Sequence, residues 1–250
     1  MTSKALPPGL DVARGETQVG VNELVLTRLF NHYPQDAAFS AVDLPCGSGH
    51  FLGCLRQLFP RAQLWGGDIA RPAPTAEDVR LFQMDLTEDF PFPPDQQFDL
   101  VTSISGVMMF SNTLRFIKNC TRMLKPGGIF VLTNDNQATI RDRLSYLFLV
   151  RYRIFDAVFE DDELMTENVP INELVRLLRT HGIEIEDIQY TSLYRKDLIF
   201  LPFAVLVWAV QYLYLRRRNT RLPAELKWKM YPFRHMFHRH YVIFGRKKAA

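Results

Sequence analysis

The sequence predicts an α/β protein with a doubly wound, mostly parallel β-sheet and helices on both faces. Short apolar runs alternate with segments of helical period, and glycine or proline separates them. An aspartate lies at the end of each of the first three apolar runs. The chain has 250 residues, of which 47% are hydrophobic and 23% charged, enough for a large core. This composition excludes a disordered or coiled-coil protein.

The first two elements are a helix and a strand. Residues 16–33 have an amphipathic pattern in which Val21 and Val25 share one face, and Pro34 ends it. Residues 38–44 are a short apolar run of the length expected for a strand.

The alternation continues to residue 133. The helical segment 51–59 stops at Pro60, the turn-rich residues 93–95 introduce a strand, and the Lys-Pro-Gly-Gly turn at 125–128 leads into another. The predicted strands are residues 38–44, 63–68, 79–84, 98–104, 129–133, 183–190 and 241–244. The predicted helices are residues 16–33, 51–59, 114–124, 140–155, 171–181 and 198–215.

The segment 198–215 contains 18 residues, of which only Gln211 is strongly polar. As a helix it would be about 27 Å long, just short of the ~30 Å hydrocarbon core of a bilayer. Pro202 predicts an early break, and strand 241–244 has to return to the sheet beside 183–190. These features favour a re-entrant helix or a helix in the membrane plane over one that spans the membrane. The alternative is a buried helix that lines a lipophilic substrate pocket.

Positive charge is concentrated near the end of the chain. Residues 195–248 contain 13 Lys or Arg and two acids, a local charge of +11, whereas the remainder carries −8 and the whole chain +3. Such an asymmetry predicts contact with an anionic partner. Because the charge flanks an apolar helix, we expect an anionic membrane surface and not a nucleic acid.

The clearest functional motif follows the first strand. Residues 41–49 (Ala-Val-Asp-Leu-Pro-Cys-Gly-Ser-Gly) lead from a strand through a glycine turn to a helix. Such a turn presents backbone N–H groups to an anionic ligand group, although an ordinary strand-to-helix turn has the same appearance. Asp68 and Asp85, at the next two strand ends, are placed to face a ribose and an adenine. A dinucleotide fingerprint would require glycine where Leu52 stands.

These motifs resemble those of class I S-adenosylmethionine-dependent methyltransferases. The similar segments, in chain order, are residues 42–49, 67–69, 84–86, 98–101 and 124–128, within a resemblance that covers 38–190 and the last strand at 241–246. The resemblance implies a seven-stranded Rossmann-like sheet and S-adenosylmethionine as cofactor. The implied cofactor-binding residues are Asp43, Pro45, Cys46, Gly47, Ser48, Gly49, Asp68, Ile69, Asp85, Leu86 and Ser103.

Two positions depart from the family pattern. Pro45 replaces the first glycine, so the turn must avoid both a positive φ and a backbone donor there. Met108, Met109 and Phe110 stand where many members carry a Glu-His pair. A base is needed only if the methyl acceptor is a weakly acidic hydroxyl, and the candidate catalytic residues are Asp135 and His50.

No metal site is expected. His235, His238 and His240 lack a nearby Cys or carboxylate, and Arg234 and Arg239 would repel a cation, so an interfacial basic patch is the better interpretation. The three cysteines are too few for a disulfide framework, and residues 1–20 do not resemble a signal peptide, which predicts a cytoplasmic protein.

The sequence is therefore interpreted as one methyltransferase domain, residues 1–250. It comprises an N-terminal helical region (1–37), a cofactor-binding half (38–139) and a substrate-side half (140–250) with an apolar and basic insertion at 192–240. The expected acceptor is a small molecule, a glycan or a lipid-linked molecule, by analogy with bacterial polysaccharide and lipid methyltransferases. Residues 195–240 would contact the inner face of a membrane, and no obligate protein partner is expected. The alternatives are a non-catalytic membrane-associated binding protein with the same fold and a nucleotide-dependent oxidoreductase.

Overall fold

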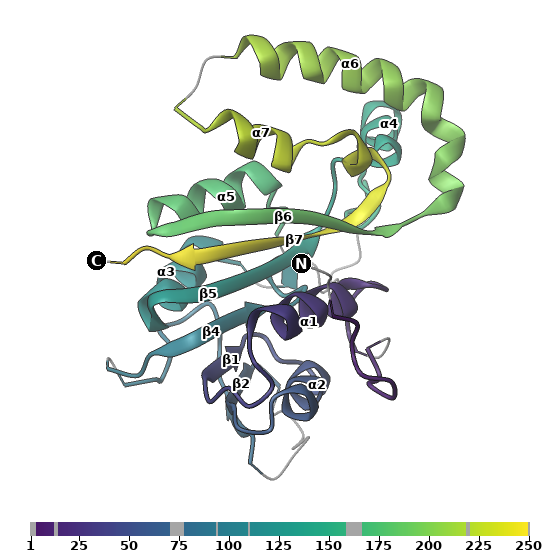
Figure 1. Ribbon diagram of the computed structural model, residues 1–250. Coiled ribbons are helices and arrows are strands. Elements are labelled where there is room, and N and C mark those ends of the chain that lie inside the picture. The colour runs from purple at the N-terminus through teal and green to yellow at the C-terminus, as the bar shows by residue number, and fades with distance from the viewer. Residues whose placement is uncertain are drawn as a thin grey trace.

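The computed structural model describes residues 4–12, 15–70, 78–93, 95–109, 111–158, 167–218 and 221–249. Within these ranges the chain forms a seven-stranded sheet in the order β3-β2-β1-β4-β5-β7-β6 (Figure 1). The strands are β1 (Ser40–Asp43), β2 (Gln63–Asp68), β3 (Arg80–Gln83), β4 (Phe98–Ser103), β5 (Leu124–Asp135), β6 (Ile183–Leu193) and β7 (His238–Lys247). Neighbours among β1 to β5 are parallel, and only β7 runs antiparallel to both of its neighbours. The predicted fold class is confirmed.

Helices cover both faces of this sheet. They are α1 (Val21–His32), α2 (His50–Leu58), α3 (Thr113–Met123), α4 (Ile140–Leu149), α5 (Ile171–Thr180), α6 (Leu201–Arg217) and α7 (Ala224–Met230). Alternate residues of one strand point to opposite faces: Ala41 packs in the cluster formed with α1 and α2, and Val42 in the cluster formed with α3 and α5. The order of the strands reverses between β1 and β4, which places a switch point at the carboxyl ends of these two strands.

Several predicted boundaries are wrong, each for a local reason. Helix α1 begins at Val21 and not at residue 16, because Gly20 adopts a left-handed conformation with φ of 84°. Helix α4 ends at Leu149, because Val150 is left-handed with φ of 54°. Pro202 does not break α6 but lies in its first turn, where proline is tolerated.

The last strand is longer than residues 241–244, and it uses part of the basic tail. The Arg246 guanidinium pairs with Glu186 of β6. The Lys247 ammonium donates hydrogen bonds to the carbonyls of Thr121 and Leu124. These two cations are therefore bonded to β6, to α3 and to the start of β5.

The insertion between β6 and β7 contains the 3-10 helix η2 (Arg195–Phe200), α6, α7 and the 3-10 helix η3 (Phe233–Met236), and it lies beyond the β6 edge (Figure 1). Asp197 of η2 is 2% exposed and forms ion pairs with Arg141 of α4 and Arg239 of β7. These ion pairs attach the start of the insertion to the rest of the protein. One face of α6 packs inward: Ala204 joins a cluster with Ile140 of α4. The inward-facing residues of α6 are Ala204, Val207, Trp208, Gln211, Tyr212 and Leu215.

Candidate functional site

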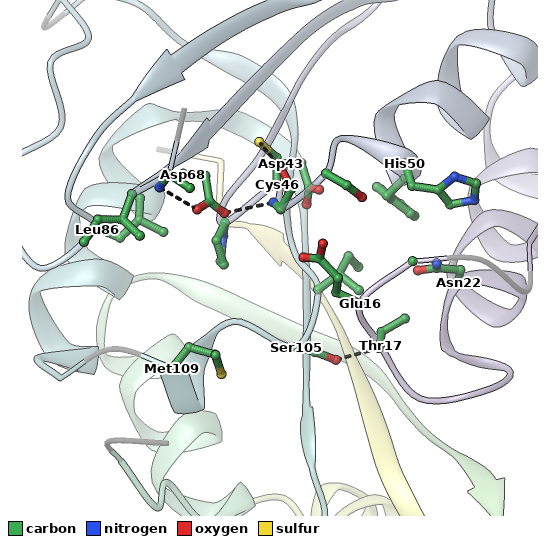
Figure 2. A pocket seen from close by; sticks show the side chains of 18 of the residues that line it. Glu16, Thr17, Asn22, Asp43, Cys46, His50, Asp68, Leu86, Ser105 and Met109 are labelled. Atoms are coloured by element: carbon green, nitrogen blue, oxygen red, sulfur yellow. Dashed lines mark hydrogen bonds between the residues drawn. The ribbon is translucent and has the colours of Figure 1, made fainter. Parts of the chain in front are cut away.

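A cavity of about 710 Å³ lies at the carboxyl ends of β1, β2 and β4 (Figure 2). Its volume is within the range of small-molecule sites. The wall comes from three parts of the chain: the segment before α1, the glycine turn between β1 and α2, and the residues after β2, β3 and β4. The cavity therefore occupies the position where open α/β sheets bind their ligands.

The glycine turn forms the floor of this cavity, and the proline within it fits the local backbone. The positive φ angles of the turn fall on Gly47 (50°) and Gly49 (75°), and not on Pro45. The residue packed against the Pro45 ring is Gly106, where any Cβ would collide with the ring. Pro45 is therefore compatible with the turn, because the left-handed positions lie further along it.

Asp68 connects the end of β2 to the glycine turn. Its carboxylate accepts hydrogen bonds from the backbone N–H of Gly47 at 2.9 Å and of Ala70 at 3.1 Å (Figure 2). The side chain is only partly buried and lines the cavity. A bound ligand with two adjacent hydroxyl groups can thus meet this carboxylate, which its backbone donors hold in place.

Apolar and acidic groups from the ends of β2 and β3 line one side of the cavity. Ile69 lines it with a side chain that is 68% exposed, and Leu86 lies there as well. Asp85 accepts hydrogen bonds from the N–H and hydroxyl of Thr87, which lower the pKa of its carboxyl. This combination of apolar side chains and a hydrogen-bond acceptor suits a purine base.

Asp43 is buried at the end of β1, with 2% of its surface exposed. The Thr102 hydroxyl donates a 2.6 Å hydrogen bond to it. Burial nevertheless raises the pKa of this carboxyl to about 7, since the Thr102 hydrogen bond does not offset the loss of hydration and nearby Asp68 adds repulsion.

This raised pKa predicts a stability gain from the Asp43→Asn substitution. Between about pH 4 and pH 7 the unfolded chain loses the Asp43 proton while the folded protein keeps it, so this group costs stability as pH rises. At pH 8 the variant should be more stable by up to roughly 4 kcal/mol, with little difference at pH 4. Urea unfolding of both proteins at the two pH values checks this, and an equal difference at both would contradict it.

Glu16 also lines the cavity, although no motif in the sequence marks it. Its carboxylate lies directly against Gly47, close enough that a Cβ at Gly47 would collide with it (Figure 2). The acids Glu16, Asp68 and Asp85 thus line the cavity together with Asp43, which is half protonated at pH 7, and no Lys or Arg of the described residues lines it. The electrostatic potential in this cavity favours a cationic ligand group.

The predicted site residues divide into two groups. Those that line the cavity are Asp43, Pro45, Cys46, Gly47, Ser48, His50, Asp68, Ile69, Asp85 and Leu86. Gly49 lies outside the lining as the N-cap of α2, and Ser103 is fully buried within β4. The Nε2 atom of His50 lies 2.7 Å from the Asp11 carbonyl, so this ring is bonded to the N-terminal segment.

Asp135 does not line this cavity. It is 5% exposed, pairs with the Arg153 guanidinium and borders a second cavity of about 680 Å³ beside α4. Between Asp135 and the first cavity stands His240, which is fully buried. Asp135 therefore has no direct contact with a ligand in the first cavity.

The prediction that His235, His238 and His240 belong to a basic surface patch is wrong for two of these three residues. His235 and His240 are buried, and burial lowers the pKa of His235 to about 4 and the pKa of His240 below its usual value. Both rings are therefore neutral at pH 7. Among the described residues, no group of three or more His, Cys, Asp or Glu is arranged to hold a metal ion.

Comparison with known proteins agrees with the fold and with the glycine turn. Residues 42–132 match the family model described as a methyltransferase domain. The malonyl-[acyl-carrier protein] O-methyltransferase of Methylococcus capsulatus is 31% identical over 109 residues, which are 40% of this chain and 39% of that protein. The match therefore spans about two fifths of the curated relative.

Two solved structures share the architecture over nearly the whole chain. The S-adenosylmethionine-dependent methyltransferase of Mesorhizobium loti has a TM-score of 0.55 at 16% identity, with 96% of this chain and 100% of that one covered. An S-adenosylmethionine-dependent methyltransferase of Archaeoglobus fulgidus has a TM-score of 0.55 at 17% identity, with 91% of this chain and 95% of that one covered. At these identities the likeness concerns the fold alone.

Proposed function

We propose that this chain, a member of the class I S-adenosylmethionine-dependent methyltransferases, binds S-adenosylmethionine in the carboxylate-lined cavity and transfers its methyl group to an acceptor at a membrane surface. The family match covers the glycine turn and the three strand ends that carry the acidic residues. The membrane location of the acceptor is proposed from the insertion between β6 and β7.

The observation that carries the cofactor assignment is the charge of the cavity. S-adenosylmethionine has a cationic sulfonium and a cationic ammonium group, whereas a nicotinamide dinucleotide has an anionic pyrophosphate. Three carboxylates, those of Glu16, Asp68 and Asp85, with no lysine or arginine among the described lining residues, favour the former. Asp68 would hold the ribose hydroxyls, Ile69 and Leu86 the adenine, and Glu16 the ammonium group.

Calorimetric titration tests the cofactor assignment. We expect the full chain to bind S-adenosylmethionine and S-adenosylhomocysteine and not to bind NAD⁺. Binding of NAD⁺ would favour the oxidoreductase alternative, and absence of binding to all three would contradict the proposal.

The sulfonium group, when bound, supplies an activated methyl group. The chain's own residues have to orient the acceptor and exclude water, and orientation alone contributes on the order of 7–11 kcal/mol to such displacements. We expect this transfer to proceed without a metal ion, because the sulfonium already activates the methyl group.

Helix α6 carries the proposal of a membrane surface. The helical stretch Arg195–Arg217 has a mean hydropathy of 2.0 over its most apolar window, of which only 6% is buried. Its outer face consists of apolar side chains, among them Leu206 (65% exposed) and Val210 (64% exposed). We name the outer surface of the insertion the apolar surface; its residues are Leu198, Ile199, Leu201, Phe203, Val205, Leu206, Val210, Leu213 and Tyr214.

Packing of the opposite face favours a helix that lies in the membrane plane. Trp208 contacts Phe233 of η3, and Tyr212 stacks on Trp228 of α7. A helix with one face on the protein and an apolar outer face can enter a bilayer only as far as the interface. A fully buried helix over a substrate pocket does not agree with this exposure.

Positively charged side chains lie at both ends of the apolar surface. Arg195 and Lys196 precede α6, and Arg216, Arg217 and Arg218 end it, all of them exposed and without an ion pair among the described residues. Such residues contribute about 1 kcal/mol each near an anionic leaflet. We infer a peripheral position on the cytoplasmic face of a membrane and a lipid-linked acceptor.

A further inference from the structure

A line of polar side chains leads from the cavity into the sheet. The Thr17 and Ser105 hydroxyl oxygens are 2.6 Å apart at the cavity wall (Figure 2). The Ser105 oxygen lies 3.2 Å from Nε2 of His240, and Nδ1 of the same ring lies 3.7 Å from Oδ1 of Asp135. Ser105 follows β4, Asp135 ends β5 and His240 belongs to β7, so three adjacent strands bring these groups together.

This arrangement of Ser105, His240 and Asp135 is energetically unfavourable in three respects, which the rest of the fold has to offset. Ser105 has φ of 56°, a left-handed conformation that is unfavourable for residues other than glycine. His240 is 1% exposed and Asp135 5%, and burial of ionisable groups is expensive. The Nδ1 atom of His240 has no hydrogen-bond partner among the described residues. Such costs at the wall of a ligand cavity are typical of functional sites.

The ring of His240 is in the state that can accept a proton. Burial lowers its pKa and Arg153 adds to this effect, while Asp135 opposes it. The ring is therefore neutral at pH 7, and its Nε2 is free to accept a hydrogen bond from the Ser105 hydroxyl when Nδ1 carries the proton. The charged groups that face the ring are Asp135 and Arg153, and its neighbour on β6 is the uncharged Thr191.

We propose that Ser105 and His240 form a proton relay that removes the proton of a hydroxyl group on the methyl acceptor, with Asp135 as the countercharge that stabilises the protonated imidazole. This inference rests on the proposed methyl transfer and specifies an oxygen nucleophile as its acceptor. The acceptor's proton passes to Ser105 Oγ, and the hydroxyl proton of Ser105 passes to His240 Nε2. Meanwhile the acceptor oxygen bonds to the methyl carbon, and the sulfur keeps the electron pair of the broken carbon–sulfur bond.

A serine reagent tests the relay without knowledge of the acceptor. With diisopropyl fluorophosphate, Ser105 Oγ would bond to phosphorus, fluoride would leave and the serine proton would move to His240. We expect mass spectrometry to find the label on Ser105. Ser48 and Ser111 line the same cavity and form no hydrogen bond with a histidine among the described residues, so they serve as internal controls. His240→Gln should slow the labelling of Ser105 by about a hundredfold.

The pH dependence provides a second readout that needs no substitution. Labelling of the wild-type protein should fall as the pH drops through the pKa of His240, below 6.5. Asp135→Asn removes the countercharge, so it should move this midpoint to lower pH. A contact that serves only the fold would give no such profile.

The outcomes separate the relay from the methyltransferase assignment. The relay is wrong if Ser105 is labelled no faster than Ser48 and Ser111, or if it is labelled as fast in His240→Gln as in the wild type. Calorimetric binding of S-adenosylhomocysteine would in that case still support the methyltransferase assignment. Rapid His240-dependent labelling without binding of S-adenosylhomocysteine would support the relay chemistry and contradict the methyltransferase assignment. Thermal unfolding of each variant verifies that it folds.

Discussion

Replacement of Asp68 by alanine should weaken the binding of S-adenosylmethionine by a factor of about one hundred or more. Each hydrogen bond to a charged group contributes about 1.5–3 kcal/mol, and two ribose hydroxyls would share this carboxylate. The substitution also removes the acceptor of the Gly47 N–H, which loosens the glycine turn. Calorimetric titration of the wild type and the variant measures the change.

Asp95 provides the matched control for this prediction. It is exposed and lies outside the cavity, so Asp95→Ala makes the same change in charge and should leave the affinity unchanged. If Asp68→Ala retains wild-type affinity and a cooperative unfolding transition, the ribose role of Asp68 is wrong.

The second large effect concerns the insertion. The wild-type protein should sediment with vesicles that contain anionic phospholipid, and the variant with Arg216, Arg217 and Arg218 changed to Glu should bind at least about a hundredfold more weakly. Added salt should weaken wild-type binding without abolishing it, because the apolar surface contributes separately. A second variant, with Leu206, Val210 and Leu213 changed to Gln, should lose affinity for neutral and anionic vesicles alike.

A control with the same change in charge distinguishes a local effect from a change in net charge. Lys118, Arg122 and Arg179 are exposed on α3 and α5, and their replacement by Glu should leave vesicle binding nearly intact. Wild-type protein that stays in the supernatant with both vesicle types would show that the apolar surface has another purpose.

The part of the site near the glycine turn could be predicted because its residues are close to strand ends. A parallel sheet aligns the carboxyl ends of its strands, so Asp43, Asp68 and Asp85 come together once the strands are identified. Glu16 could not be predicted in this way, because the segment before α1 folds back over Gly47 without a local signal. The same is true of Ser105 and His240, which are 135 residues apart.

The histidines illustrate why charge cannot be inferred from sequence alone. His235 and His240 lie among arginines in the sequence, which predicted a basic patch. Their strands and turns instead direct the rings inward, where burial keeps them neutral. The exposed face of α6 could not be predicted either. The apolar composition of residues 198–215 predicted a helix, but the packing of Trp208 and Tyr212 against the protein determines which face remains exposed.

We propose above that the protein methylates a lipid-linked acceptor with S-adenosylmethionine. The most direct test incubates the full chain with methyl-labelled S-adenosylmethionine and a total lipid extract of the source organism, followed by partition between chloroform and water. Label should enter the organic phase in the presence of the wild-type protein and not in the presence of Asp68→Ala. Label that stays in the aqueous phase, with a wild-type protein that binds the cofactor, would contradict it.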